Sequence, residues 1–359
     1  MNDIQILKAV KKRERGSRLL YYADFTDACW ENVAKSYGTK KDREEFCIER
    51  GFFISKVLFP KRRDDAPKLD FSQYFRDIKI PEGVKPDPEG MLMMPGSTYH
   101  FTHLISPLRN IYDFDEIRRF PIYRRKEHFD FSHYKRVVEE SHARGQTVKA
   151  WAGRFFETAW PLRGYENMLA DMIVEPETAE YFLDIETDFN KAKVTAAAEA
   201  GADMLVFGDD VGTQKGMMFS AALWRQTIKP RFASVIQTAR NIAPDIIVWY
   251  HSCGDITEII PDLIEIGVDI LNPIQPECMD IWDIHKRYKD KLSFDGGLGT
   301  QKLIPFGTPK EIEAAVKKLV EVFGQNGGFI LSPSHVLEPE VPPDNVKAFL
   351  DAAQQYCSY

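Results

Sequence analysis

The second half of the chain repeats one pattern, in which a short apolar run precedes a longer segment of helical period. The runs end at Gly, Asp, Asn, His or Pro, and the segments behind them carry apolar residues at every third or fourth position. Such alternation predicts consecutive strand–helix units. Six of these runs follow one another along the sequence, at 146–153, 202–210, 246–254, 268–275, 291–299 and 327–335.

Two upstream runs, 17–25 and 52–59, raise the number of predicted units to eight. Eight strand–helix units predict an α/β fold, a single (β/α)₈ (TIM) barrel domain over residues 1–359. The segment 60–140 fits this rhythm poorly and is rich in Pro, Asp and aromatic residues. We interpret it as an irregular insertion, a lid over the barrel mouth with its own strand pair. A doubly wound open sheet is the alternative, but no G-x-G-x-x-G turn follows a predicted strand.

Charge and cysteine usage narrow the class of protein. The formal net charge is −7 and the pI is near 5.7, which argues against a nucleic-acid-binding surface. The five cysteines form no short-spaced framework, as expected for reduced thiols in a cytoplasmic protein. We find no apolar run of about 18 residues, so no membrane association is expected.

Polar side chains gather where the predicted strands end, and barrel enzymes place their active sites at the carboxyl ends of the strands. Asp209 and Asp210 close the fourth run. Asp209 is our candidate for a catalytic general acid or base, although one of the two could simply cap the following turn. Candidate substrate-binding residues come from the other run ends and from the aromatic first run: Tyr21, Tyr22, Trp30, Asp210, Asn272, Gln275 and Asp295.

The stretch "WYHSCGDI" places an imidazole and a thiol one residue apart. His251 and Cys253 share one face of a strand because side chains alternate. Asp255 and Glu258 have the spacing of a capping box, so we expect a helix to begin there and its dipole to favour the Cys253 thiolate. Thiolate and imidazole make a two-ligand start for Zn²⁺. The alternative is a buried apolar cysteine beside a core histidine. Candidates for a third ligand are His335, Cys278, Glu277 and Glu338.

Three segments carry a family resemblance: "WYHSCGDITEIIPDLIEIGVDILNP", "GRFFETAWPLRGYENMLADMIVEPE" and "GGFILSPSHVLEPEVPPDNV". Over roughly residues 145–355 the chain resembles the uroporphyrinogen decarboxylase superfamily, and within it the corrinoid-dependent methyltransferases. The resemblance implies a (β/α)₈ barrel and a zinc site formed by H-x-C after strand five and a cysteine after strand eight. His251 and Cys253 match the pair. His335 stands in the third position, with Cys278 or Glu277 as alternatives.

The resemblance implies a zinc-dependent methyltransferase that moves a methyl group between a small substrate and the corrinoid (cobalamin) of a separate protein. The aromatic-rich insertion, with Tyr21, Tyr22 and Trp30 nearby, suggests an aryl methyl ether rather than a bare thiol, which makes the protein an O-demethylase component. The decarboxylase's closely spaced arginines are missing from "SRLLYYADFTDACWENVAKSYG", which argues against uroporphyrinogen as substrate. Two other functions remain open: a lyase acting on a smaller carboxylate through Asp209 and His335, and a non-catalytic barrel that binds a corrinoid or tetrapyrrole.

Overall fold

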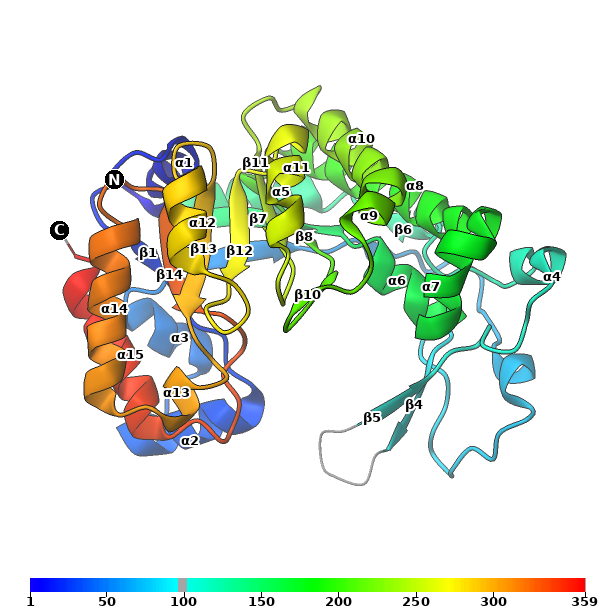
Figure 1. The fold of residues 1–359 in the computed structure, drawn as a ribbon, viewed down its shortest axis with the longest axis horizontal. Coiled ribbons are helices and arrows are strands. Elements are labelled where there is room, and N and C mark those ends of the chain that lie inside the picture. The colour runs from blue at the N-terminus through cyan, green and yellow to red at the C-terminus, as the bar shows by residue number, and fades with distance from the viewer. Residues whose placement is uncertain (96–101, 359) are drawn as a thin grey trace.

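The computed structural model describes residues 1–95 and 102–358, and its centre is a parallel sheet of eight strands (Figure 1). Each of the eight predicted runs contains one of them. The order is β1-β14-β13-β12-β11-β8-β7-β2, which is chain order around a barrel. The strands are β1 (Leu20–Tyr21), β2 (Ser55–Leu58), β7 (Thr147–Gly153), β8 (Met204–Gly208), β11 (Ile247–His251), β12 (Ile270–Ile274), β13 (Ser293–Leu298) and β14 (Phe329–Pro333).

The predicted (β/α)₈ barrel is therefore confirmed. Strands β1 and β2 are the two ends of the sheet order, and no strand ladder joins them among the described residues. The backbone N–H of Phe53, just before β2, donates to the carbonyl of Tyr21 at 2.8 Å. We call this junction the β1–β2 seam.

Helices cover the outside of the barrel, as the periodic segments predicted. The longest is α8 (Pro176–Ala200), which packs on α10 (Lys229–Arg240). The others are α1 (Asp3–Lys12), α2 (Asp27–Tyr37), α3 (Arg43–Glu49), α4 (Phe114–Arg118), α5 (Tyr134–Ala143), α6 (Phe156–Arg163), α7 (Tyr165–Val174), α9 (Ala221–Thr227), α11 (Ile260–Ile266), α12 (Ile281–Tyr288), α13 (Leu303–Phe306), α14 (Pro309–Phe323) and α15 (Pro343–Tyr356). The described residues also form three short 3₁₀ helices, η1 (Ser72–Phe75), η2 (Lys126–His128) and η3 (Thr257–Ile259).

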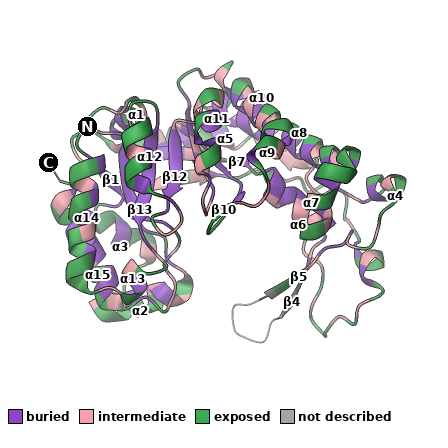
Figure 2. Ribbon diagram, viewed as in Figure 1, coloured by how far each residue is buried: buried purple, intermediate pink, exposed green. Residues whose placement is uncertain are grey.

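Strand alternation divides the core into two clusters. Figure 2 shows that the strands of the sheet are mostly buried. The larger cluster fills the space between strands and helices. The smaller cluster lies inside the barrel, where α1 packs Ile6, Leu7 and Val10 against the inward side chains of Leu20, Met204, Val206, Ile247, Ile270 and Ile330. The barrel interior is thus sealed by apolar contacts at the end where α1 lies.

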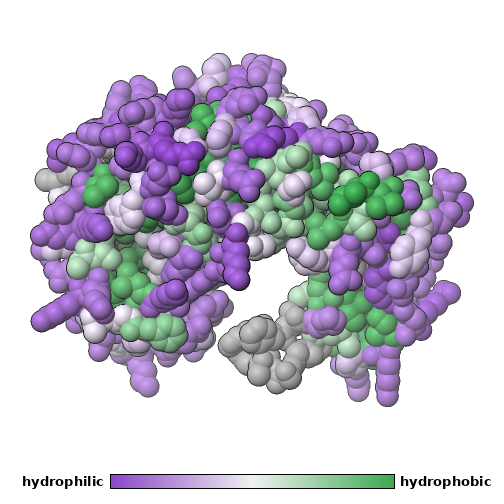
Figure 3. Space-filling model, in the orientation of Figure 1, coloured by the Kyte–Doolittle hydropathy of each residue, from purple (hydrophilic) through white to green (hydrophobic). Residues whose placement is uncertain are grey.

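The segment 60–140 contains two antiparallel pairs, β3 (Lys61–Arg62) with β6 (Phe129–Asp130) and β4 (Leu92–Pro95) with β5 (Thr102–Ile105). In Figure 1, β4 and β5 lie across from α2 and α13, on the side to which the arrowheads of β13 and β14 point. The space-filling surface is hollowed between these two parts (Figure 3). The lid function of this segment stays a prediction.

A buried ion cluster ties the segment to the barrel helices. The guanidinium of Arg124 donates to both oxygens of Glu89 at 2.7–2.9 Å. It also lies 3.5 Å from Glu186 on α8, a side chain that Lys193 approaches to 3.8 Å. Glu186 and Lys193 are fully buried while Arg124 and Glu89 are partly exposed, so the two buried charges are paired with each other and with Arg124, as buried charges require. Within the described part of the chain, no helix combines the length and apolarity needed to cross a membrane.

Candidate metal centre

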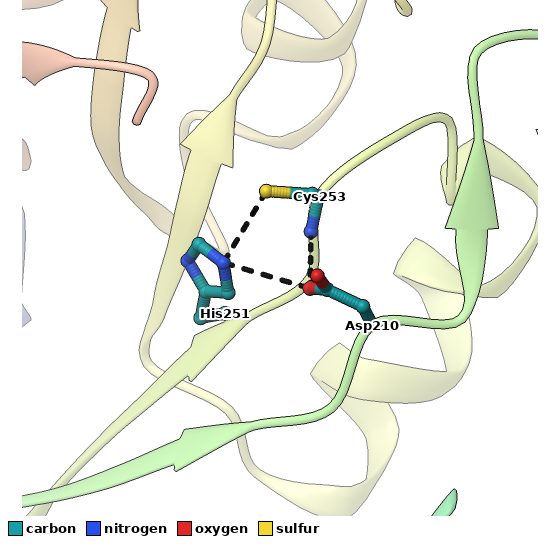
Figure 4. Close-up of side chains that lie close together, drawn as sticks. All are labelled: Asp210, His251 and Cys253. Atoms are coloured by element: carbon teal, nitrogen blue, oxygen red, sulfur yellow. Dashed lines mark hydrogen bonds and ion pairs between the residues drawn. The ribbon is translucent and has the colours of Figure 1, made fainter. Parts of the chain in front are cut away.

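Three side chains that can bind a metal ion meet at the carboxyl ends of β8 and β11 (Figure 4). The carboxylate of Asp210, Nε2 of His251 and Sγ of Cys253 all lie within 4.8 Å of one another. Sγ of Cys253 is 3.4 Å from Nε2 of His251, which is 3.5 Å from Oδ1 of Asp210. Each of these residues is partly exposed, so an ion can reach the group from solvent.

The spacing and chemistry of this group fit zinc. Zinc binds oxygen, nitrogen and sulfur at about 2.0–2.3 Å, so neighbouring ligands of a tetrahedral site stand about 3.3–3.8 Å apart. The two distances of 3.4 and 3.5 Å fall within that interval. Carboxylate, imidazole and thiolate are all zinc ligands, and three protein ligands leave a fourth position for a substrate.

The orientation of His251 is fixed by Asn272 on the neighbouring strand β12. Nδ1 of His251 lies 2.6 Å from the amide oxygen of Asn272. Since that oxygen can only accept, Nδ1 carries the proton and the Nε2 lone pair faces Asp210 and Cys253. Metal-binding histidines commonly have their other ring nitrogen held in this way. Asn272 was predicted to bind substrate, and the structure shows it supporting His251.

Asp210 is held by backbone contacts from two directions. Its N–H donates to Oε2 of Glu157 at 2.8 Å, and its Oδ1 accepts the N–H of Cys253 at 2.8 Å. The loop behind Asp210 forms the hairpin β9 (Gly212–Thr213) and β10 (Gly216–Met217). A Cβ on Gly212 would stand 2.6 Å from the carbonyl of Cys253, and Gly254 has φ +84°. Only glycine permits this close approach of the two loops.

Cys253 does not lie at a helix N-terminus, so that expectation is wrong. The chain after Gly254 enters η3 at Thr257, and α11 begins at Ile260 without a side-chain cap. Asp255 accepts from the N–H of Thr257 at 2.9 Å, and the capping box predicted with Glu258 is not formed. Burial, followed by the charges of nearby acidic groups, raises the pKa of Cys253 to about 12. The thiol therefore stays protonated until a cation displaces its proton.

Asp209, the predicted general acid or base, lies buried beneath Asp210. Its carboxylate accepts three backbone N–H groups, those of Phe155 at 3.2 Å, Phe156 at 3.1 Å and Glu157 at 2.8 Å. Burial raises the pKa of Asp209 to about 7, against the effect of these donors. These donors place the carboxylate at the start of α6, which precedes it in the chain, whereas the capping alternative concerned the turn after Asp209. A catalytic role for Asp209 stays a prediction.

Asp295 lies inside the barrel rather than at the end of its strand, because β13 continues to Leu298. Its carboxylate accepts from Oγ of Ser332 at 2.7 Å, Nε1 of Trp249 at 2.8 Å and the hydroxyl of Tyr22 at 3.1 Å. Burial raises the pKa of Asp295, while these hydrogen bonds lower it. Two predicted substrate-binding residues, Tyr22 and Asp295, are thus brought together below the metal centre.

Two residues of the loop after β12 lie beside the Cys253 loop. Oε1 of Gln275 accepts the N–H of Gly254 at 3.0 Å, which holds the turn that follows Cys253. Cys278, an alternative ligand, directs its thiol to Oε1 of Gln214 at 3.3 Å. Cys278 is therefore close to the centre without belonging to the three-residue group.

The other predicted ligands lie apart from this group. Oε1 of Glu277 accepts the N–H of Gln301 at 3.0 Å. His335 is exposed after β14, with Nδ1 3.3 Å from the carbonyl of Val336. The structure does not place His335 beside His251, so its assignment as third ligand stays a prediction.

Two predicted substrate-binding aromatic residues pack elsewhere. The hydroxyl of Tyr21 donates to the carbonyl of Arg50, and its ring belongs to the cluster between strands and helices. Trp30 on α2 makes an edge contact with Phe46 at 5.2 Å and lies 6.3 Å from Phe25. Both rings support the α2–α3 region in this structure.

Sequence reasoning did not identify Asp210 as a ligand or Glu157 as its support. The available signal was the doubled aspartate at the end of the fourth run, because β8 pairs with β11 in register, His251 beside Gly208. Asp210 lies two residues after Gly208, and Cys253 lies two residues after His251. Both therefore come to the same end of the barrel.

A family model settles the relationship. Residues 102–356 match the model of the uroporphyrinogen decarboxylase (URO-D) family, which is well over half of the chain. The chain belongs to the uroporphyrinogen decarboxylase family. It is 25% identical over 201 residues to a methylated-thiol–coenzyme M methyltransferase of Methanosarcina mazei, and 25% identical over 185 residues to a methylcobamide:CoM methyltransferase of Methanosarcina barkeri.

These alignments span 56% and 51% of this chain and 51% of each relative, so the chain spans about half the length of the curated relatives it matches. A uroporphyrinogen decarboxylase of Alcanivorax borkumensis is 31% identical over 53% of the chain and 52% of that protein. A solved methyltransferase from Methanosarcina mazei superposes with a TM-score of 0.64 at 17% identity, covering 99% of both chains. That likeness shows the barrel fold.

Proposed function

We propose that this protein is a zinc-dependent methyltransferase that moves a methyl group between a small substrate and the corrinoid of a separate protein. The observation that carries the proposal is the group formed by Asp210, His251 and Cys253, with ligand atoms spaced as a tetrahedral ion needs. The names of the two methyltransferase relatives support the reaction class. A cytoplasmic location fits this function.

Asp210, His251 and Cys253 hold the zinc ion in this proposal. Their two anionic groups, a carboxylate and a thiolate, balance the charge of a divalent ion. When bound, zinc supplies a Lewis acid that polarises an oxygen or sulfur atom at the open position. The chain's own residues orient the ligands: Asn272 directs Nε2 of His251, and Glu157 fixes the backbone of Asp210.

For the small substrate we propose an aryl methyl ether, which makes the protein an O-demethylase component. An aromatic substrate is supported by Tyr22 and Trp249, whose side chains both donate to Asp295 below the metal centre. Trp249 stacks on His251 with ring centroids 6.0 Å apart. Since a methylated thiol and coenzyme M appear in the names of the two relatives, a thiol is the second candidate substrate.

A metal and transfer assay tests the proposal. The purified chain is loaded with zinc and analysed for metal, and then mixed with cob(I)alamin and either methoxybenzene or a methyl thioether. We expect about one zinc per chain and formation of methylcobalamin, seen as the change in the corrinoid spectrum. Zinc binding without methyl transfer from either donor to cob(I)alamin would contradict the proposed methyltransferase.

The purified chain, tested with and without zinc, also distinguishes the proposed methyltransferase from the lyase and from the non-catalytic barrel. A lyase acting through Asp209 and His335 would release carbon dioxide from a small carboxylate in the metal-free chain. A non-catalytic barrel would retain corrinoid through gel filtration and show no turnover. Either result would replace the proposal.

A further inference from the structure

A cavity of about 520 Å³ opens into the barrel interior at the β1–β2 seam. Met204, Val206 and Ile330, which belong to the inner cluster that α1 joins, also line it. Its walls combine inward side chains of the barrel with residues beside the seam, and those that matter here are Tyr22, Val57, Lys149, Val206, Trp249 and Asp295. A space of this size accommodates a small organic molecule.

Lys149 is the unusual wall residue. In β7 the buried residues Val148 and Ala150 face the outer cluster, so Lys149, between them, faces the interior together with Trp151. Within the described parts of the chain, no hydrogen bond or ion pair of its ammonium group is found, although the residue is half-buried. Lysines withdrawn from solvent are normally paired, and Lys149 differs in this from Lys56, the exposed lysine of the same wall.

The opposite end of the cavity has a different character. There Tyr22 and Trp249 present aromatic surface, and both donate to the Asp295 carboxylate. The wall includes the apolar side chains of Val57 and Val206, and it also carries charged residues: Asp24, Arg43, Glu44 and Lys56. A ligand that satisfies both ends needs an anionic group at Lys149 and an apolar, preferably aromatic, body toward Trp249.

We infer that this cavity binds a small organic acid, with its carboxylate on Lys149 and its apolar body against Tyr22 and Trp249. An ion pair formed in a half-buried space is stronger than one in open water, because the surrounding dielectric is lower. The inference concerns binding and does not require methyl transfer. Ser55, at the start of β2, and Gln146, just before β7, add polar groups to the cavity wall.

The register relates this cavity to the metal centre. Lys149 pairs with Met204, and His251 pairs with Gly208, four residues further along β8. At about 3.3 Å per residue, the two levels are about 13 Å apart. The lining of the cavity includes none of Asp210, His251 and Cys253, so the acid site and the metal centre are separate.

Ligand titration of the zinc-free chain tests the inference, with benzoate, butyrate and acetate as probes. Benzyl alcohol and butanol are the uncharged counterparts. Binding is followed by ligand-observed nuclear magnetic resonance and by Trp fluorescence. We expect benzoate to bind at least tenfold more tightly than benzyl alcohol and more tightly than acetate. Equal binding of acid and alcohol would overturn the assignment of Lys149, and absence of binding by all three acids would overturn the site.

Variants test whether acid binding depends on the ammonium group of Lys149 itself or only on the net charge of the protein. Lys149→Met should weaken benzoate binding at least tenfold and leave benzyl alcohol unchanged, whereas Lys149→Arg should restore most of the affinity. Lys8→Met removes an exposed lysine of α1 and should bind benzoate like the parent chain. If Lys149→Met unfolds the protein, two measurements still test the role of Lys149. These are benzoate binding by Lys149→Arg and the comparison of benzoate with benzyl alcohol in the parent chain. Because no step needs zinc or corrinoid, failure here is distinct from failure of the proposed methyl transfer.

Discussion

The ends of β8, β11 and β12 contrast with the end of β14, although all four were expected to contribute to one site. On the first side, Asp210, His251 and Cys253 are within reach of one ion, and each is fixed by a hydrogen bond to a neighbouring strand or loop. On the second side, His335 is exposed and has one weak contact with its own neighbour, Val336.

The difference shows that adjacency in the sheet decides which polar residues can form a centre. β11 pairs directly with β8 and β12, so their loops contact one another, whereas β14 lies two strands beyond β12. A family pattern places a ligand after strand eight, but the local hydrogen bonds of this chain assemble the group on the strand-five side. The following predictions test that contrast.

Of the variants considered, replacing Cys253 should have the largest effect on zinc binding. Cys253→Ala removes one of three ligands and the anion that best balances a divalent ion, so we expect zinc to fall from about one per chain to below a tenth. Metal analysis after gel filtration measures this. Cys278→Ala is the matched control and should keep full metal. Retention by Cys253→Ala with loss in Cys278→Ala would move the site toward β12.

Comparing Asp210 with His335 tests the two sides directly. Asp210→Ala should weaken zinc binding by about tenfold to a hundredfold, while His335→Ala should stay within about twofold of the parent. Competition with a chromophoric chelator gives both affinities. The reverse order would establish His335 as the third ligand and show that the loop after β14 moves when metal binds.

The support of His251 predicts an intermediate effect. Asn272→Leu leaves Nδ1 without its acceptor, so zinc affinity should fall by about tenfold or somewhat more. Asn272→Asp keeps an acceptor oxygen and should retain most of the affinity. Equal losses in the two variants would indicate a packing role for this residue.

Proton release from Cys253 predicts a pH dependence. Burial raises the pKa of this thiol to about 12, so the metal-free site is protonated throughout the neutral range. Since zinc binding must displace that proton, apparent affinity should rise about tenfold per pH unit between about pH 7 and 9. The same chelator competition measures the slope. A flat profile would mean that Sγ does not bind the ion.

Asp209 should affect stability more than metal binding. Asp209→Ala leaves three backbone N–H groups at the start of α6 without their acceptor, which should cost about 1–2 kcal/mol of unfolding free energy. Denaturant unfolding measures the loss, and Asp188→Ala, at an exposed position of α8, is the control. Unchanged stability together with abolished methyl transfer would support the catalytic role instead.

Much of the fold could be predicted from the sequence because strand and helix periods differ, and all eight runs contain a barrel strand. Alternation likewise predicted that His251 and Cys253 share a face. The sequence could not predict that Asp209 binds backbone N–H groups while Asp210 joins the metal-binding group. This difference depends on where the N–H groups of residues 155–157 lie in the fold. The helix expected at Asp255 does not begin there. The chain turns at Gly254, which lies against the loop of Gly212, and α11 begins only at Ile260.

The contact between Gly212 and Gly254 has a consequence for metal selectivity. The two loops that carry Asp210 and Cys253 meet through main-chain atoms, so their separation is set independently of the ligand side chains. Ligand identity can therefore change while the geometry is retained. Asp210→Cys would convert a mixed oxygen–nitrogen–sulfur set into a thiolate-rich one, which favours softer ions such as cadmium over cobalt and manganese.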